Sequence, residues 1–207
     1  MKNPSHPALS AATASETMLP GSAYGPKFGK ESPNCISLTL SATRAAGPRS
    51  RSGTGPSIGS MPDPFLEAAI DQAGQGLAEG GIPIGSVLVV DGRIVGRGHN
   101  RRVQKGSPIL HGEMDALENA GRLLAAEYRR SVIYTTLSPC HMCTGAILLY
   151  GIPRVVIGDN RTFMGAENLL RASGVEVTMV DDQRCVDLMD DFIRARPDLW
   201  NEDIGEE

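Results

Sequence analysis

Cysteine and long apolar runs are both scarce in this 207-residue chain. Its four cysteines are too few for a disulfide framework, and the spacing of Cys140 and Cys143 favours metal or redox chemistry in a reducing compartment. No stretch approaches the roughly 20 apolar residues of a membrane helix, and no N-terminal apolar segment is typical of a secretory signal. We therefore expect a cytoplasmic protein with no membrane partner.

An excess of basic residues is also missing from most of the chain. Residues 1–60 hold six lysines and arginines against two glutamates, or about +4, which leaves about −8 for the rest because the whole chain carries −4. Nucleic-acid affinity rests on neutralising phosphates with lysine and arginine, so a net-acidic domain binds polyanions poorly. The charge therefore favours a small-molecule partner over nucleic acid.

The two parts of the chain differ in composition. Residues 1–60 are rich in serine, glycine and proline and lack apolar periodicity, which predicts a disordered, low-complexity N-terminal extension. Its basic, serine-rich character leaves an organelle-targeting peptide as an alternative, although glycine and proline break the amphipathic helix that such a peptide needs. We expect an extension without a role, with Met61 as the functional start and the folded domain over 61–207.

Hydrophobic spacing predicts an α/β fold for this domain. Apolar residues recur at helical spacing from Phe65 to Leu77, and Asp91 with Gly92 marks a hairpin turn between two strands within 86–99. Further helices are predicted over 111–124, 140–150 and 187–195, and strands over 131–136, 154–158 and 175–180. Because strands and helices alternate, we expect a sheet covered by helices on both faces, with parallel pairs after the first hairpin.

Four residues have the spacing of a catalytic zinc site. His111, Cys140 and Cys143 supply the nitrogen and sulfur ligands that zinc prefers, and a catalytic site leaves the fourth position to water. Cys140 and Cys143 stand one turn apart at a predicted helix N-terminus, where the helix dipole stabilises thiolate. Glu113, two residues after the histidine, is placed to take a proton from the activated water and pass it on. This H-x-E and P-C-x-x-C pattern is typical of zinc deaminases that act on nucleobases.

Other interpretations of these residues are weaker. A redox cysteine pair needs neither His111 nor Glu113, and a structural zinc needs a fourth protein ligand. We expect His141 to point away from the two cysteines, His99 to be structural, and Cys185 to be a buried apolar residue in a helix. A non-catalytic zinc protein would not be expected to keep all four residues.

Longer segments resemble a known family. HGEMDALENAGRL, TTLSPCHMCTGAILLYGIPRVVIGDN, DDQRC and RPDLWNEDIGE are similar to the fungal-type cytosine deaminases of the cytidine-deaminase-like superfamily, over nearly all of residues 62–207. The resemblance implies a three-layer α/β/α sandwich around a central five-stranded mixed sheet. It also implies a homodimer, a Zn²⁺ cofactor and an active site capped by the C-terminal tail.

The resemblance also assigns roles to residues outside the zinc pattern. It implies that Asn100 and Asp203 hydrogen-bond the polar edge of the base, and that Phe163 and Trp200 wall the site. It further implies that Ile82 packs beneath the base and that the backbone of Gly112 and Cys140 contacts it. Such a set suits a small planar ring, which offers two apolar faces and an edge of donors and acceptors.

The expected reaction is hydrolytic deamination of a free nucleobase, from cytosine to uracil plus ammonia, with zinc-activated water and Glu113 as the proton shuttle. Asp115 departs from the smaller, neutral residues of the fungal enzymes, so isocytosine or a guanine-like base stays an alternative substrate. A tRNA adenosine deaminase shares the zinc pattern, but it must admit ribose and phosphates. We expect a nucleobase-binding homodimer of pyrimidine salvage in the cytoplasm.

Overall fold

The computed structural model describes residues 63–206, so Cys35 and the N-terminal extension predicted to be disordered lie outside the described part. In chain order, the helices and strands are α1 (Pro64–Ala78), β1 (Gly85–Val90), β2 (Arg93–His99), α2 (Arg102–Lys105), α3 (Gly112–Ala120), α4 (Ala125–Tyr128), β3 (Ser131–Leu137), α5 (His141–Tyr150), β4 (Arg154–Asp159), α6 (Glu167–Ala172), β5 (Glu176–Met179), α7 (Gln183–Ala195) and α8 (Pro197–Ile204). Among these described helices, none is both long and apolar enough to cross a membrane.

The five strands form one mixed sheet in the order β2-β1-β3-β4-β5. Strand β1 runs antiparallel to β2 and β3, whereas β3, β4 and β5 run parallel to one another. Asp91 and Gly92 join β1 to β2 with φ angles of 49° and 74°, the positive values that a type I′ hairpin turn requires. The predicted hairpin and the five-stranded mixed sheet are both confirmed.

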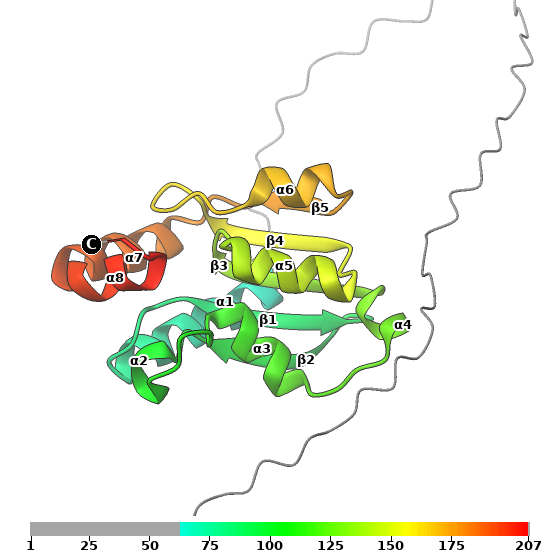
Figure 1. The fold of residues 1–207 in the computed structure, drawn as a ribbon, viewed down its shortest axis with the longest axis horizontal. Helices are drawn as coiled ribbons and strands as arrows, with labels where there is room; N and C mark the ends of the chain where they lie inside the picture. The colour runs from blue at the N-terminus through cyan, green and yellow to red at the C-terminus, as the bar shows by residue number, and fades with distance from the viewer. Residues whose placement is uncertain (1–62, 207) are drawn as a thin grey trace, which may run out of the picture. The chain divides into compact units, whose positions relative to one another are not determined.

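Helices cover both faces of the sheet, which confirms the α/β/α sandwich (Figure 1). Leu88 of β1 packs in a cluster with side chains of α3, α5 and α6, whereas its neighbours Val87 and Val89 pack against α1. Successive residues of a strand point to opposite faces, so these two clusters lie on opposite sides of the sheet. A third cluster, which includes Leu137 and Trp200, packs α7 and α8 against the ends of the strands.

Two glycines of β2 let α3 lie directly on the sheet. A Cβ atom at Gly98 would overlap the backbone of Asp115 and Ala116, and one at Gly96 would overlap the carbonyl oxygen of Ala116. Only glycine allows a helix backbone to approach a strand this closely. The contact fixes the axis of α3 and therefore the position of His111 at its N-terminus.

Several element bounds differ from the sequence prediction. Helix α3 ends at Ala120 rather than at residue 124, because Gly121 takes a φ of 72°. Helix α7 begins at Gln183 rather than at residue 187, because the Asp182 side chain accepts from a backbone N–H of the first turn. The sequence pattern does not predict α2, α4 or α6, which have only four to six residues, or α8, which starts at Pro197 directly after α7.

Candidate active site

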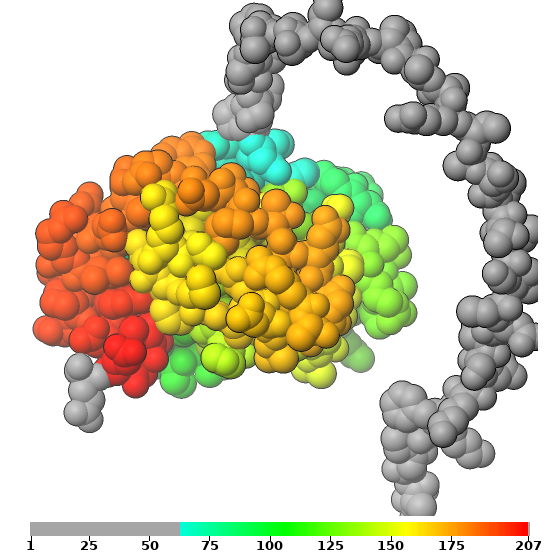
Figure 2. Space-filling model, turned by 90° about the horizontal axis from the view of Figure 1, so that it is seen from above, coloured from blue at the N-terminus to red at the C-terminus, as the bar shows by residue number. Residues whose placement is uncertain are grey.

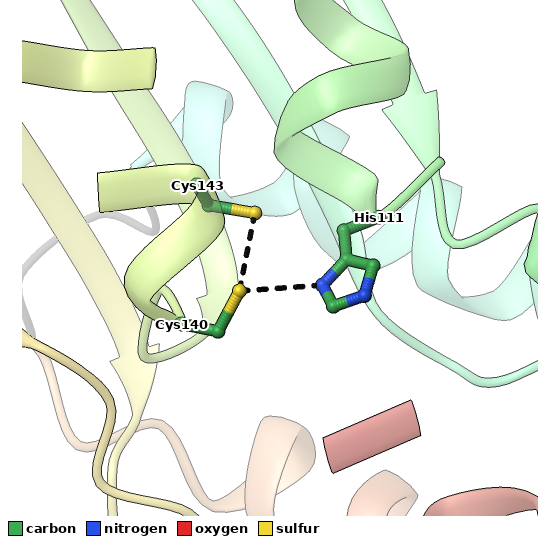
Figure 3. A group of neighbouring side chains, drawn as sticks. All are labelled: His111, Cys140 and Cys143. Atoms are coloured by element: carbon green, nitrogen blue, oxygen red, sulfur yellow. Dashed lines mark hydrogen bonds between the residues drawn. The ribbon is translucent and has the colours of Figure 1, made fainter. Parts of the chain in front are cut away.

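Three donor atoms from two helices converge at the site. His111 is the N-cap of α3, Cys140 is the N-cap of α5, and Cys143 lies in the first turn of α5. The Cys140 sulfur lies 3.5 Å from His111 Nδ1 and 3.7 Å from the Cys143 sulfur (Figure 3). All three donor atoms lie within 4.8 Å of one another.

These distances fit a tetrahedral zinc ion. Bonds of about 2.3 Å to sulfur and 2.0 Å to nitrogen place two sulfurs about 3.8 Å apart, and a sulfur and a nitrogen about 3.5 Å apart. The Cys143 thiol hydrogen-bonds to Cys140 and lowers the pKa of Cys140 to about 4, so this sulfur is already disposed to be a thiolate ligand. The donor set and its geometry are therefore those of a zinc site.

Glu113 lies beside these donors in the first turn of α3. Its side chain is buried, and the hydroxyl of Thr135 on β3 donates to its Oε1 atom at 2.9 Å. Burial raises the pKa of Glu113, and the neighbouring Cys140 sulfur raises it further. Sequence reasoning missed Thr135, which is one of two consecutive threonines in a largely apolar strand and has no further signal.

A small cavity of about 20 Å³ adjoins these groups. It is lined by His111, Glu113, Phe163, Trp200 and Asp203, among others. The Phe163 and Trp200 rings meet edge to face with centroids 5.7 Å apart. Figure 2 shows the segments that carry them side by side on the surface, the yellow loop after β4 and the red helix α8. The structure thus brings together residues that are far apart in the sequence, such as His111 and Asp203, which are 92 positions apart.

The remaining predicted residues lie around this cavity. Asn100 is fully buried, and its Nδ2 donates to Asp203 Oδ1 at 2.9 Å. Ile82 belongs to the apolar cluster around Trp200, but the isoleucines that line the cavity are Ile84 and Ile204. Gly112 is buried, and a Cβ atom there would lie 3.0 Å from the Ile84 carbonyl oxygen.

Arg102 is a contact that sequence reasoning missed. Its Nη1 donates to Asp203 Oδ1 at 2.9 Å, and its Nη2 lies 3.2 Å from Glu202 Oε1. Asp203 Oδ1 also lies 3.8 Å from Nε2 of His111, on the ring edge opposite the sulfur donors. A carboxylate beside the second nitrogen of a metal-binding histidine is a common device for orienting the ring. Asp203 therefore brings helix α8 next to the zinc donors.

His99, His141 and Cys185, which the sequence analysis set aside, lie outside this site, and so does Asp115, which it linked to an alternative substrate. His99 is buried, with Nε2 3.0 Å from Glu79 Oε2, and His141 is exposed. Cys185 is buried in α7, where burial raises its pKa to about 12. Asp115 is buried facing β2, and it accepts from the His99 backbone N–H at 3.2 Å. Among residues 63–206, only the histidine and two cysteines described above form a group with metal-binding spacing.

Comparisons with known proteins agree with this geometry. Residues 61–159 match the family model of the cytidine and deoxycytidylate deaminase zinc-binding region. The chain is 60% identical over 142 residues to cytosine deaminase of Candida albicans, which covers 68% of this chain and 95% of that protein. It is 41% identical over 112 residues to tRNA-specific adenosine deaminase of Streptococcus pyogenes, which covers 51% of this chain and 67% of that protein.

A solved structure from work on A-to-I editing tRNA deaminases, which act at the wobble position, has a TM-score of 0.51 at 26% identity. It covers 60% of this chain and 97% of that chain. The fold, the His-Cys-Cys donor set and the high identity over most of the domain lead to one assignment. The chain belongs to the cytosine deaminase family of zinc-dependent hydrolases.

Proposed function

We propose that this protein hydrolyses free cytosine to uracil and ammonia. The observation that carries the proposal is the convergence of Glu113, two aromatic rings and Asp203 on one small cavity beside the zinc donor set. His111, Cys140 and Cys143 would hold the zinc ion. When bound, zinc supplies a Lewis acid that makes water acidic enough to act as a nucleophile near neutral pH.

Glu113 would move the protons of the reaction. Its carboxyl group is buried and adjoins the cavity, and the Thr135 hydroxyl orients it by donating to Oε1. We propose that it accepts a proton from water and delivers it to ring nitrogen 3 as the water oxygen adds to ring carbon 4. It then carries the second proton to the amino nitrogen, and the carbon–nitrogen bond breaks to release ammonia.

Asn100 and Asp203 would select the base by its polar edge. Asn100 is fully buried and presents an amide, and Asp203 presents a carboxylate, so the pair offers both donors and acceptors. Phe163 and Trp200 would cover the flat face of the ring. Ile82 and the backbone of Gly112 would support the ring from the protein core.

The small cavity favours a free base over a nucleoside. A volume of about 20 Å³ holds roughly one water molecule, so the residues of α8 and the loop after β4 must move apart to admit even a single ring. A ribose or a tRNA strand would have to displace α8, whose Asp203 is tied to Asn100 and Arg102. We therefore propose that the substrate is a free base and that no nucleic acid binds.

Ammonia release by the zinc-loaded protein tests this function. The panel is cytosine, isocytosine, guanine, cytidine and adenosine, with Glu113→Ala of verified zinc content as the control. We expect turnover of cytosine alone, and a loss of several orders of magnitude in the control. Turnover of isocytosine or guanine would support the proposed chemistry but reject cytosine as the only substrate. Turnover of cytidine or adenosine would contradict the argument that the cavity excludes ribose.

We also propose that the protein acts as a homodimer in the cytoplasm, in pyrimidine salvage. The supporting surface is the apolar face near the ends of α3 and α5, where Leu149 is 78% exposed, Leu124 72% and Tyr150 41%. A hollow lined in part by Met114 and Leu117 adjoins these side chains. Analytical ultracentrifugation of Leu149→Lys against the wild type tests the dimer, and an unchanged sedimentation coefficient would contradict this face.

A further inference from the structure

A buried carboxylate lies beneath the loop formed by residues 160–166. Glu167, the first residue of α6, is only 4% exposed. Its Oε1 accepts from the Ser138 hydroxyl and from the Asn160 side-chain amide, both at 2.9 Å. Its Oε2 accepts from Arg171 Nη1, also at 2.9 Å, on the surface side of the same helix. One side chain therefore collects three donors from three segments.

The same contacts fasten the loop at both ends. Asn160 opens the loop, and Gly165 near its end donates its backbone N–H to the Ser138 hydroxyl oxygen at 3.0 Å. Ala166 donates its N–H to the Pro139 carbonyl oxygen at 2.9 Å, and a Cβ atom at Gly165 would overlap that same oxygen. The loop is therefore held against the segment that leads into Cys140.

Phe163 stands in the middle of this fastened loop. Its ring is half-buried and meets the edge of the Trp200 ring, while the next residue, Met164, is 67% exposed. The loop thus turns one large side chain toward the cavity and leaves the other in solvent. Burial opposes ionisation of Glu167, but the hydrogen bonds from Asn160, Arg171 and Ser138 together lower its pKa.

We propose that Glu167 is a positioning residue, which holds the 160–166 loop through Ser138 and Asn160 so that Phe163 covers the base. The catalytic part of this inference rests on the proposed function, since it takes Phe163 to contact the substrate. The structural part does not, because the position of the loop is measured by its contact with Trp200. The ion pair of Glu167 with Arg171 contributes little to holding the loop, because the Arg171 side chain is exposed.

The first test uses the fact that the chain has a single tryptophan, Trp200. This ring is 6% exposed beside Phe163, so its fluorescence reports on the loop without any turnover. In the zinc-loaded protein we expect Glu167→Ala to shift the emission to longer wavelength and to raise acrylamide quenching at least twofold. Glu167→Gln keeps an oxygen for Ser138 and Asn160, so it should match the wild type, and so should Arg171→Ala.

Two results would overturn the structural part. Quenching of Glu167→Ala equal to that of the wild type would show that the loop does not depend on this residue. An equal increase in acrylamide quenching in Glu167→Gln and Glu167→Ala would show that the loop depends on the charge of Glu167, rather than on the two hydrogen bonds at Oε1. If Glu167→Ala fails to fold, Asn160→Ala can replace it. This variant removes only the hydrogen bond from Asn160 to Glu167, so it should give a smaller increase in quenching.

The second test is a kinetic double-mutant cycle with cytosine. We expect Phe163→Ala and Glu167→Ala each to raise KM about tenfold with a smaller change in kcat, and the double variant to be no worse than Phe163→Ala. Multiplicative effects in the double variant would show that Glu167 acts independently of the ring. A wild-type protein without cytosine turnover would reject the proposed function and leave the fluorescence result to decide the role of Glu167.

Discussion

Removal of Arg102 should weaken the packing of helix α8 over the candidate site. This arginine donates to Asp203 at 2.9 Å and lies 3.2 Å from Glu202, so it is the charged link between the start of α2 and α8. In Arg102→Ala, the Asp203 carboxylate would keep the hydrogen bond from Asn100 at 2.9 Å but would lose its charged partner. The Asp203 side chain is only 2% exposed, so water cannot easily replace that partner.

The size of the effect follows from the three contacts that change. A hydrogen bond between charged groups contributes about 1.5–3 kcal/mol, and the Asp203 bond is of this kind. The Glu202 side chain is 67% exposed, so that ion pair contributes at most about 1 kcal/mol. Among the described residues, Arg102 Nε is buried without a hydrogen-bond partner, so its removal returns about 1 kcal/mol. We expect a net loss of about 2 kcal/mol in the free energy of unfolding.

Urea denaturation of the zinc-loaded protein measures this loss. The matched control is Arg194→Ala, since within residues 63–206 Arg194 pairs only with Asp191, and the two side chains are 74% and 77% exposed. We expect the control to change stability by less than about 0.5 kcal/mol. The Michaelis constant for cytosine should also rise in Arg102→Ala. If Arg102→Ala is as stable as Arg194→Ala, the packing of helix α8 does not depend on this link.

Three further predictions test other parts of the structure. Gly98→Ala should destabilise the domain by about 3 kcal/mol or prevent folding, because the new Cβ overlaps the α3 backbone; unchanged urea unfolding would contradict that contact. Burial raises the pKa of Cys185 from 9.0 to about 12, so the folded state favours the neutral thiol. The contribution of this shift to folding stability is complete below pH 9 and is lost as the pH rises toward 12. The difference in Tm between wild type and Cys185→Ala should therefore shrink from pH 8 to pH 11, and a constant difference would reject it. Removal of zinc by a chelator should lower the Tm by several degrees, because His111, Cys140 and Cys143 join two helices through the ion, and a Cys143→Ala variant should show no such response.

The sequence predicts the sheet well because its signals are local. Asp91 and Gly92 fix the hairpin through their positive φ angles, and apolar strands bounded by turns are distinct in the pattern. Short helices escape prediction because four to six residues contain barely one turn of periodicity. Helix α8 escapes for a different reason: Pro197 follows α7 so closely that the two helices show no separating loop signal.

The candidate site divides in the same way. Sequence spacing alone predicts the pair His111 and Glu113 and the pair Cys140 and Cys143, because each pair lies within about one helical turn. The preference of zinc for nitrogen and sulfur ligands then assigns the histidine and the two cysteines to one site. Contacts such as that of Glu113 with Thr135, or that of Arg102 with Asp203, join residues that are 22 and 101 positions apart. Only the folded arrangement of sheet and helices determines such pairs. A resemblance to a family supplies the cavity-lining residues, but not the side chains that hold them.

The pairing of β3 with β4 has a consequence for how this enzyme family can diverge. The two strands are parallel, and Leu137 pairs with Asp159, so the segments that follow them leave the sheet side by side. The first leads into Cys140 and the chemistry of the metal, and the second carries Phe163 and the shape of the pocket. Substitutions in the loop after β4 that keep its bonds to Ser138 and Pro139 would therefore change the wall of the cavity without moving the zinc donors. The residues that hold the metal and the residue that shapes the cavity therefore follow two neighbouring strands of the sheet.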